Sequence, residues 1–137
     1  MKKFIMVSVL CVLSGCTSMS SVDTPPTTTP ATPVFFQPFS AALDEPALST
    51  IASVAKAASQ QPDTKVFVTG AADSVGSAKA NKYLSETRAQ VVADALAADG
   101  VDESRIHIRA LGIVPPTVGP TGTPAQSARR VLIQLGG

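Results

Sequence analysis

The chain has 137 residues, a formal net charge of +1 and 15% charged residues. That length predicts one domain, and the near-neutral charge excludes a strongly basic nucleic-acid-binding surface. Apolar residues make up 45% of the chain but aromatic residues only 4%, which indicates a tightly packed core with few large rings.

The N-terminus has the pattern of an export signal. Lys2 and Lys3 form a positively charged start, and the apolar run over residues 4–13 is too short to cross a bilayer as a helix. The run leads into Leu-Ser-Gly-Cys at positions 13–16, which resembles the lipobox of bacterial lipoproteins.

The lipobox resemblance implies that residues 1–15 are a cleaved signal peptide and that Cys16 carries a diacylglycerol anchor of the palmitate type. An ordinary signal peptide followed by an unpaired thiol is the alternative. The other cysteine, Cys11, lies inside the cleaved segment, so the sequence predicts no disulfide in the mature chain. Thr17, rather than Asp, follows the anchor and resembles the outer-membrane sorting signal of enterobacterial lipoproteins.

Residues 16–33 are interpreted as a tether between the anchor and a folded part. From Thr17 to Pro33 the chain is mostly Ser, Thr and Pro, and so few apolar side chains cannot offset the entropy of ordering. Extended chain of this composition spans about 3.1 Å per residue, so it holds a domain well away from a membrane. The folded domain is expected over residues 34–137.

The first elements of this domain are a strand and a helix. Residues 34–36, Val-Phe-Phe, predict a short strand that ends near Pro38. Pro46 lies in the first turn of a helix that Pro62 stops. The apolar residues of this helix recur at helical spacing and are Leu48, Ile51, Ala52, Ala55 and Ala58.

A second strand and a second helix follow. Residues 65–70 place Val66 and Val68 on one face of a strand. After a turn, residues 79–99 repeat apolar positions at helical spacing until Gly100 ends the helix. The apolar positions of the helix are Leu84, Val91, Val92, Ala95 and Leu96.

Two further strands complete the domain. Residues 105–109 and residues 131–135 alternate polar and apolar side chains, and residues 112–126 between them form a loop rich in Pro, Gly and Thr. The order strand, helix, strand, helix, strand, strand predicts an α/β (α+β) sandwich. In it a mixed sheet is covered by two helices, with right-handed crossovers between parallel strands.

Arg88 carries the most informative charge, because it lies in line with the apolar stripe of the second helix. A buried guanidinium needs a partner, so we expect a carboxylate nearby, from the protein or from a ligand, and an apolar residue at this position would remove the cost of burying the charge. Asp73 is the candidate, since the turn after the second strand brings it near the helix. The alternatives are an Asp73 that bonds only to its own turn and an Arg88 that extends to water.

The remaining polar residues are interpreted as structural. His107 lies on the polar face of the third strand and is expected to be solvated. Arg129 or Arg130 is expected to pair with a carboxylate of the domain, and a second ligand contact is the less favoured role. We expect no metal cluster, no cofactor and no catalysis, since the sequence has no Ser-His-Asp or paired-carboxylate arrangement.

The stretch from Gly70 to Gly76 resembles the signature of the OmpA-like C-terminal domain, together with Asn81, Leu84-Ser85 and Arg88-Ala89. In that family the pattern is roughly Gly-His-Thr-Asp, two residues, Gly, then Tyr-Asn, Leu-Ser and Arg-Ala. Asp73 and Arg88 occupy its Asp and Arg positions with the family's separation. The resemblance covers the whole folded part of the chain.

This resemblance implies non-covalent binding of peptidoglycan through the diaminopimelate of its stem peptide. Asp73 would accept a hydrogen bond from the ammonium of diaminopimelate, while the Arg88 guanidinium would form a bidentate, charge-assisted pair with its carboxylate. Asn81, two helical turns before Arg88, would lie at the edge of the pocket. The chain departs from the family pattern where it has alanine in place of polar or aromatic residues, at Ala71, Ala72, Ala80 and Ala128.

The resemblance and the lipobox together predict a lipid-anchored protein of the outer membrane whose domain faces the periplasm and tethers that membrane to the cell wall. Its expected partners are the peptidoglycan stem peptide and the membrane, with no nucleic acid. The alternative is an accessory lipoprotein of an envelope or secretion complex that uses the fold for protein contacts. The alanine substitutions slightly favour this alternative.

Overall fold

The computed structural model describes residues 29–115 and 125–136. Its strands and helices are β1 (Thr32–Phe35), α1 (Glu45–Ser59), β2 (Lys65–Ala72), α2 (Ala78–Ala98), β3 (Ile106–Ile113) and β4 (Arg130–Gly136). Single 3₁₀ turns at Glu103–Arg105 and Gln126–Ala128 precede β3 and β4.

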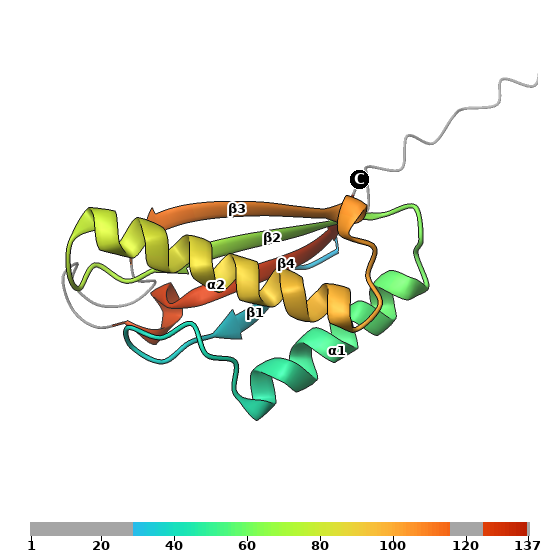
Figure 1. Cartoon of the computed structure of the whole chain (residues 1–137), viewed down its shortest axis with the longest axis horizontal. Coiled ribbons are helices and arrows are strands. Elements are labelled where there is room, and N and C mark those ends of the chain that lie inside the picture. Colours follow the sequence, from blue (N-terminus) through green and yellow to red (C-terminus); the bar gives the residue numbers. More distant parts are fainter. Residues whose placement is uncertain (1–28, 116–124, 137) are drawn as a thin grey trace, which may run out of the picture.

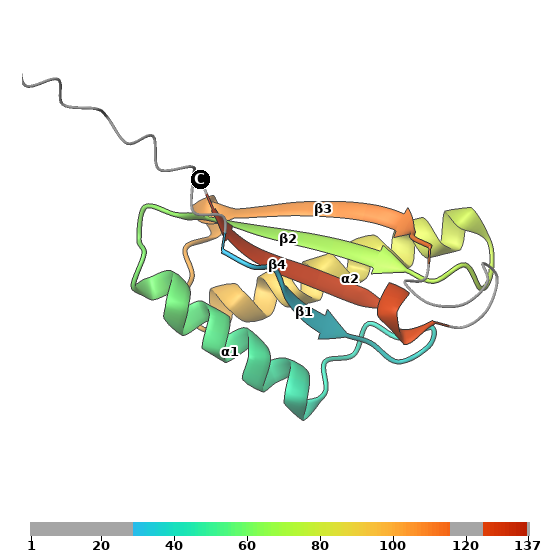
Figure 2. The same cartoon turned by 180° about the vertical axis from the view of Figure 1, so that it is seen from behind.

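The strands form one mixed sheet in the order β1-β4-β2-β3. Strands β2 and β3 are parallel and joined through α2, whereas β4 runs antiparallel to both of its neighbours, β1 and β2. Both helices cover the same face of the sheet, and the opposite view shows the sheet in front of them (Figures 1 and 2). The α/β fold with two helices over a mixed sheet, predicted from the order of the elements, is confirmed.

The strand boundaries differ from the prediction by a few residues, most clearly at the start of β1 and at the end of β3. Strand β1 begins at Thr32, which pairs with Ile133, so the last residues of the Pro-rich segment already belong to the sheet. Strand β3 continues to Ile113 and includes Gly112, where a loop was expected. In both cases pairing with a neighbouring strand extends the element beyond what the local composition indicates.

Helix α1 begins where the sequence predicts, but it is rotated about its axis. Asp44 caps the helix by accepting from the backbone N–H of Ala47 at 2.9 Å. Leu48 is 43% exposed, and Ala52 is also exposed. The buried face is instead formed by Ala47, Ile51, Val54, Ala55 and Ala58.

Helix α2 buries two kinds of residue along one face. Its C-terminal half contributes apolar side chains, including Val92 and Leu96, to the core between helices and sheet. Its N-terminal half buries the polar side chains of Asn81, Ser85 and Arg88. Buried polar groups need hydrogen-bond partners, so this end of the helix requires a polar environment.

Gly70 lets α2 approach β2 closely. A Cβ atom added at this position would lie 2.0 Å from the backbone oxygen of Ser85 and 3.0 Å from the Cβ of Ala89. Ser85 itself is fully buried, donates to the Lys82 carbonyl oxygen and accepts from the backbone N–H of Gly112. Helix α2 is therefore fixed to β2 and β3 at the level where its buried face becomes polar.

Arg105, the residue before β3, joins the start of that strand to the end of α1. Its guanidinium donates to the carbonyl oxygens of Ala58, Gln61 and Thr64, at 3.1, 2.7 and 2.9 Å. These carbonyls lie at the C-terminus of α1 and just beyond it, where helices lack internal donors and favour cations. Among the described residues, no helix is long and apolar enough to cross a membrane.

Replacing Gly70 with Ala should destabilise the fold, because the added methyl group meets backbone rather than a movable side chain. Overpacking of this kind costs about 1–3 kcal/mol and occasionally more. Gly136→Ala is the matched control, since nothing lies within 4 Å of a Cβ added there. Chemical denaturation of the two variants should show a large loss for Gly70→Ala and a change of less than about 0.5 kcal/mol for Gly136→Ala. Equal stabilities would contradict the close approach.

Candidate functional site

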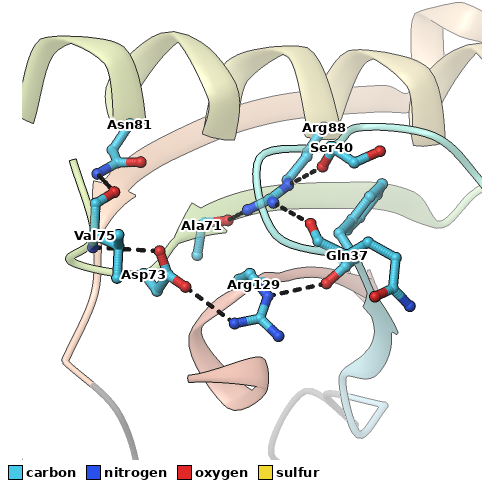
Figure 3. Close-up of polar contacts among 9 residues, drawn as sticks. Gln37, Ser40, Ala71, Asp73, Val75, Asn81, Arg88 and Arg129 are labelled. Carbon is cyan, nitrogen blue, oxygen red and sulfur yellow. Dashed lines mark hydrogen bonds and ion pairs between the residues drawn. The ribbon is translucent and has the colours of Figure 1, made fainter. Parts of the chain in front are cut away.

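Three segments of the chain meet at one end of the sheet. Because β1 and β2 both run antiparallel to β4, the carboxyl ends of β1 and β2 and the start of β4 lie at the same end of the sheet. The segments 36–43, 73–77 and 125–129 adjoin that end of the sheet, and the N-terminal half of α2 passes above it (Figure 3).

Arg88 lies at the centre of this end and is fully buried. It points from α2 toward the loop after β1 (Figure 3). Its Nε donates to the Ser40 carbonyl oxygen at 2.8 Å, its Nη2 to that of Gln37 at 3.0 Å and its Nη1 to that of Ala71 at 3.1 Å. One side chain thus connects α2, the loop after β1 and the end of β2.

The structure corrects the prediction of a carboxylate as the direct partner of Arg88. The partners of the guanidinium are three backbone carbonyl oxygens, and its Cζ also lies 5.2 Å from the centroid of the Phe36 ring. The alternative in which Arg88 extends to water is wrong, since the residue has no exposed surface. Removing the charge would therefore also remove three hydrogen bonds.

Burial lowers the pKa of Arg88 to about 10, and the positive charge of Arg129 adds to this effect, whereas the negative charge of Asp73 opposes it. The side chain remains protonated at neutral pH, because that value still lies about three units higher. Asp73 acts on Arg88 through its charge and forms its direct ion pair elsewhere.

Asp73 pairs with Arg129, at the residue before β4. Arg129 Nη1 lies 3.0 Å from Asp73 Oδ2, and Arg129 Nε donates to the Phe36 carbonyl oxygen at 3.2 Å. The other oxygen of Asp73 accepts from the backbone N–H of Val75 at 3.4 Å, a long contact within the turn. The prediction that Arg129 or Arg130 pairs with a carboxylate of the domain is confirmed for Arg129.

Asn81 supports the turn that carries Asp73. Its side chain is buried, and Nδ2 donates to the Val75 carbonyl oxygen at 3.0 Å. Gly76 in the same turn has φ of +100°, a conformation that glycine adopts without strain. Asn81 therefore lies beside the site, as its spacing from Arg88 predicted, and is engaged with backbone.

The loop after β1 is the part of the site that sequence reasoning missed. Gln37 and Ser40 contribute backbone carbonyls, and no side-chain pattern signals that role. Between them Phe39 has φ of +54° and is 72% exposed, a conformation that is unusual for a large side chain. The two bonds from Arg88 hold this turn on both sides of Phe39.

The positions that depart from the OmpA-like pattern differ in exposure. Ala71, Ala72 and Ala128 are buried at the site end of the sheet, whereas Ala80 is exposed at the start of α2. The Ala71 carbonyl oxygen is one of the three that bind Arg88.

The expected solvated position of His107 is confirmed, and its ring stacks on the exposed ring of Phe67 at 5.4 Å between centroids.

Comparison with known proteins gives a consistent result. The model of the OmpA family matches residues 35–130. The probable lipoprotein YiaD of Escherichia coli strain K12 is 38% identical over 103 residues, which cover 74% of this chain and 47% of that protein. The chain thus spans about half the length of this relative.

Two solved structures are similar in fold. The peptidoglycan-associated lipoprotein from Burkholderia pseudomallei has a TM-score of 0.69 at 22% identity, covering 75% of this chain and 88% of that one. The cell wall anchor of the type VI secretion system from Pseudomonas aeruginosa has a TM-score of 0.62 at 25% identity, covering 78% and 80%.

Replacing Arg88 with Met should destabilise the fold, because three carbonyl oxygens lose their donor while side-chain length is largely kept. Since each buried unsatisfied group costs about 1–3 kcal/mol and water can reach part of the loop, we expect a loss of about 2–4 kcal/mol. The control is Arg109→Met, at an exposed position of β3, with a change of less than about 0.5 kcal/mol. An Arg88→Met protein as stable as wild type in chemical denaturation would show that the three bonds contribute little.

Proposed function

The chain belongs to the OmpA family, and from this premise we propose that it binds peptidoglycan non-covalently through the diaminopimelate of the stem peptide. In this proposal the domain faces the periplasm and links a lipid-anchored outer-membrane protein to the cell wall. Two similar proteins named above support the kind of partner, since one is called peptidoglycan-associated and the other a cell wall anchor.

The observation that carries the proposal is the partly exposed ion pair at the end of the sheet. The side chains of Asp73 and Arg129 are 10% and 11% exposed and lie 3.0 Å apart. The free end of diaminopimelate has an ammonium and a carboxylate on one carbon atom, so both of its charges find an opposite charge within one small site. Neutral sugars of the glycan offer no such match.

Each predicted site residue has a role in this proposal. Asp73 accepts from the ligand ammonium through the lone pairs that its contacts with Arg129 and Val75 leave unused. Asn81 holds the turn that presents Asp73. Arg88 supplies positive charge beneath the site and fixes the loop after β1.

We propose the same N-terminal organisation that the sequence predicts. The signal peptide over residues 1–15, the lipidated Cys16 and most of the tether lie outside the described residues. The strand pairing of Thr32 and Pro33 with β4 supports a folded domain that begins at β1. The relative in Escherichia coli is named a probable lipoprotein, which supports an anchored chain.

A second function is favoured by one specific observation. Large apolar side chains between 37% and 44% exposed occur on β3 and on the neighbouring strand, namely Phe67, Ile108, Leu111 and Ile113. Within the described residues β3 is an edge strand that pairs with β2, and exposed edges of this kind favour pairing with other chains. An accessory role in an envelope or secretion complex would use this edge and would leave the Asp73 site unoccupied.

Replacing Asp73 with Asn should weaken binding to purified sacculi, because the side chain keeps its shape but loses the negative charge that attracts the ligand ammonium. Hydrogen bonds to charged groups contribute about 1.5–3 kcal/mol, so we expect roughly a tenfold to hundredfold loss of affinity. Asp63→Asn, in an exposed turn before β2, is the matched control and should bind like wild type. Co-sedimentation with purified peptidoglycan that is free of other proteins measures the binding of wild type and of both variants.

The two functions give opposite outcomes in that experiment. If wild type does not sediment with sacculi while thermal melts show a folded domain, the peptidoglycan proposal fails and the accessory role replaces it. If wild type and Asp73→Asn sediment equally, binding occurs away from this site.

Replacing Cys16 with Ser should abolish the lipid anchor and leave the protein unprocessed or released from the membrane fraction, because only the thiol accepts the diacylglycerol. Intact-mass analysis of the wild-type protein should show loss of residues 1–15 and added acyl mass on Cys16. Ser14→Thr, which keeps the cysteine, serves as the control for disturbance of the signal. A wild-type mass that retains Met1 or an unmodified Cys16 would overturn this part of the proposal.

A further inference from the structure

We propose that the face of the sheet opposite the two helices binds the surface of an anionic phospholipid bilayer. The inference is independent of the Asp73 site, and it draws on the proposed lipid anchor only because an anchored domain stays near a bilayer. We call this surface the open face. Its central side chains are Phe67, Thr69, His107, Arg109, Leu132 and Gln134.

The register of the sheet places these side chains together. Val66 and Val68 are fully buried in the core beneath the helices, so Phe67, which lies between them, points to the other side. Directly paired residues of neighbouring strands share a face. Both helices lie behind the sheet in Figure 2, so no described helix covers this side. The pairs that form the open face are Phe67 with His107 and Gln134, and Thr69 with Arg109 and Leu132.

The charged side chains of the open face are all basic. The four strands contain no Asp or Glu, but they contain Lys65, His107, Arg109 and Arg130. Lys65 and Arg130 each lie two residues before a residue of the open face, so they extend it. The carboxylates of the described residues lie on the helices or in the turns between elements. The open face is therefore cationic, although the whole chain has a net charge of only +1.

The open face also exposes aromatic rings beside its basic side chains. The ring of Phe67 is stacked on that of His107, and Phe35, which is 42% exposed, pairs with Arg130 across β1 and β4. A depression of about 530 Å³ is lined by Phe67, His107 and Arg109 among others. A lipid phosphate in this depression would meet the Arg109 guanidinium. Apolar and basic side chains combined on one surface are typical of proteins that lie in the headgroup region of a membrane.

A bilayer accounts for both features of the open face at once. Its phosphate groups match the basic side chains wherever they lie, and the boundary of its acyl chains accommodates Phe35 and Phe67. A neutral polysaccharide would leave the charge without a purpose. Each basic side chain near an anionic surface contributes roughly a fivefold gain in affinity. Such weak contacts are sufficient for an anchored domain, because the tether keeps the bilayer at a high effective concentration.

The test uses tryptophan as a reporter, because the chain contains none. Phe67→Trp places the reporter on the open face, and Tyr83→Trp places it on α2, at a position that is 59% exposed. The full chain with either substitution is reconstituted into vesicles whose phosphatidylcholine carries brominated acyl chains, which quench nearby tryptophan. One set of vesicles contains phosphatidylcholine alone, and the other contains it in equal parts with phosphatidylglycerol.

In the vesicles with phosphatidylglycerol, the emission of Phe67→Trp should fall roughly twofold or more relative to unbrominated lipid, because the open face lies against the bilayer. The emission of Tyr83→Trp should not change. In phosphatidylcholine alone neither reporter should be quenched. Phe35→Trp replaces Phe67→Trp if thermal melts show that the latter is unfolded.

Two double variants, made in the chain with the Phe67→Trp reporter, test the basic side chains. Lys65→Gln with Arg109→Gln removes two charges from the open face and should weaken the contact roughly thirtyfold, which removes most of the quenching. Lys56→Gln with Lys79→Gln is the matched control. It removes two exposed charges from α1 and α2, gives the same net charge and should keep the quenching.

The inference is overturned if Phe67→Trp is quenched no more than Tyr83→Trp in the anionic vesicles, or if both double variants lose quenching equally. In the first case an acidic protein would be the partner that fits the open face. Both outcomes are distinct from failure of the proposed function, because no peptidoglycan is present and because the mass of Cys16 tests the anchor separately.

Discussion

The structure of the site end depends on the hydrogen bonds that one buried guanidinium makes to three carbonyl oxygens. Arg88 extends from α2 and binds both the loop after β1 and the end of β2. The two carbonyl groups of this loop belong to Ser40 and Gln37, which precede Arg88 by 48 and 51 residues, and the bonds hold the loop against the helix. Once this loop is fixed, Phe36 can accept from Arg129, and Arg129 in turn lies within reach of Asp73. The ion pair between Asp73 and Arg129, which is about 10% exposed, thus depends on the buried cation.

Much of the fold could be predicted because each element is locally consistent, but the site could be predicted only in part. The alternation of Val66 and Val68, Pro46 in the first turn of α1 and Gly100 after α2 predict the elements, and the structure confirms their order. The rotation of α1 was missed because alanine, which is buried at position 47 and exposed at position 52, gives a weak hydrophobic signal. Burial of Arg88 followed from its place in the stripe. Its partners did not, because backbone carbonyls have no sequence pattern.

Helix α2 illustrates how one element combines stability and recognition. Its apolar C-terminal half packs in the core, where burial of side chains such as Leu96 contributes about 1.5–3 kcal/mol each. Its N-terminal half gives up that stabilisation and buries Asn81, Ser85 and Arg88, all of which have hydrogen-bond partners. Among the described residues no buried side-chain nitrogen or oxygen lacks a partner. The polar half therefore satisfies its buried groups through backbone partners, and Asn81 supports the turn that carries Asp73.

The position of β1 has a mechanical consequence. The chain enters the sheet at Thr32, at the end opposite to the Asp73 site, and β1 runs antiparallel to β4 between these two ends. In the proposed arrangement, with the site bound to the cell wall and the N-terminus anchored in a membrane, a pulling force therefore acts along the strands. Such a load shears the β1–β4 hydrogen bonds together, rather than opening them one at a time. The four residues of β1 then carry the load from the N-terminal segment into the sheet through their pairing with β4.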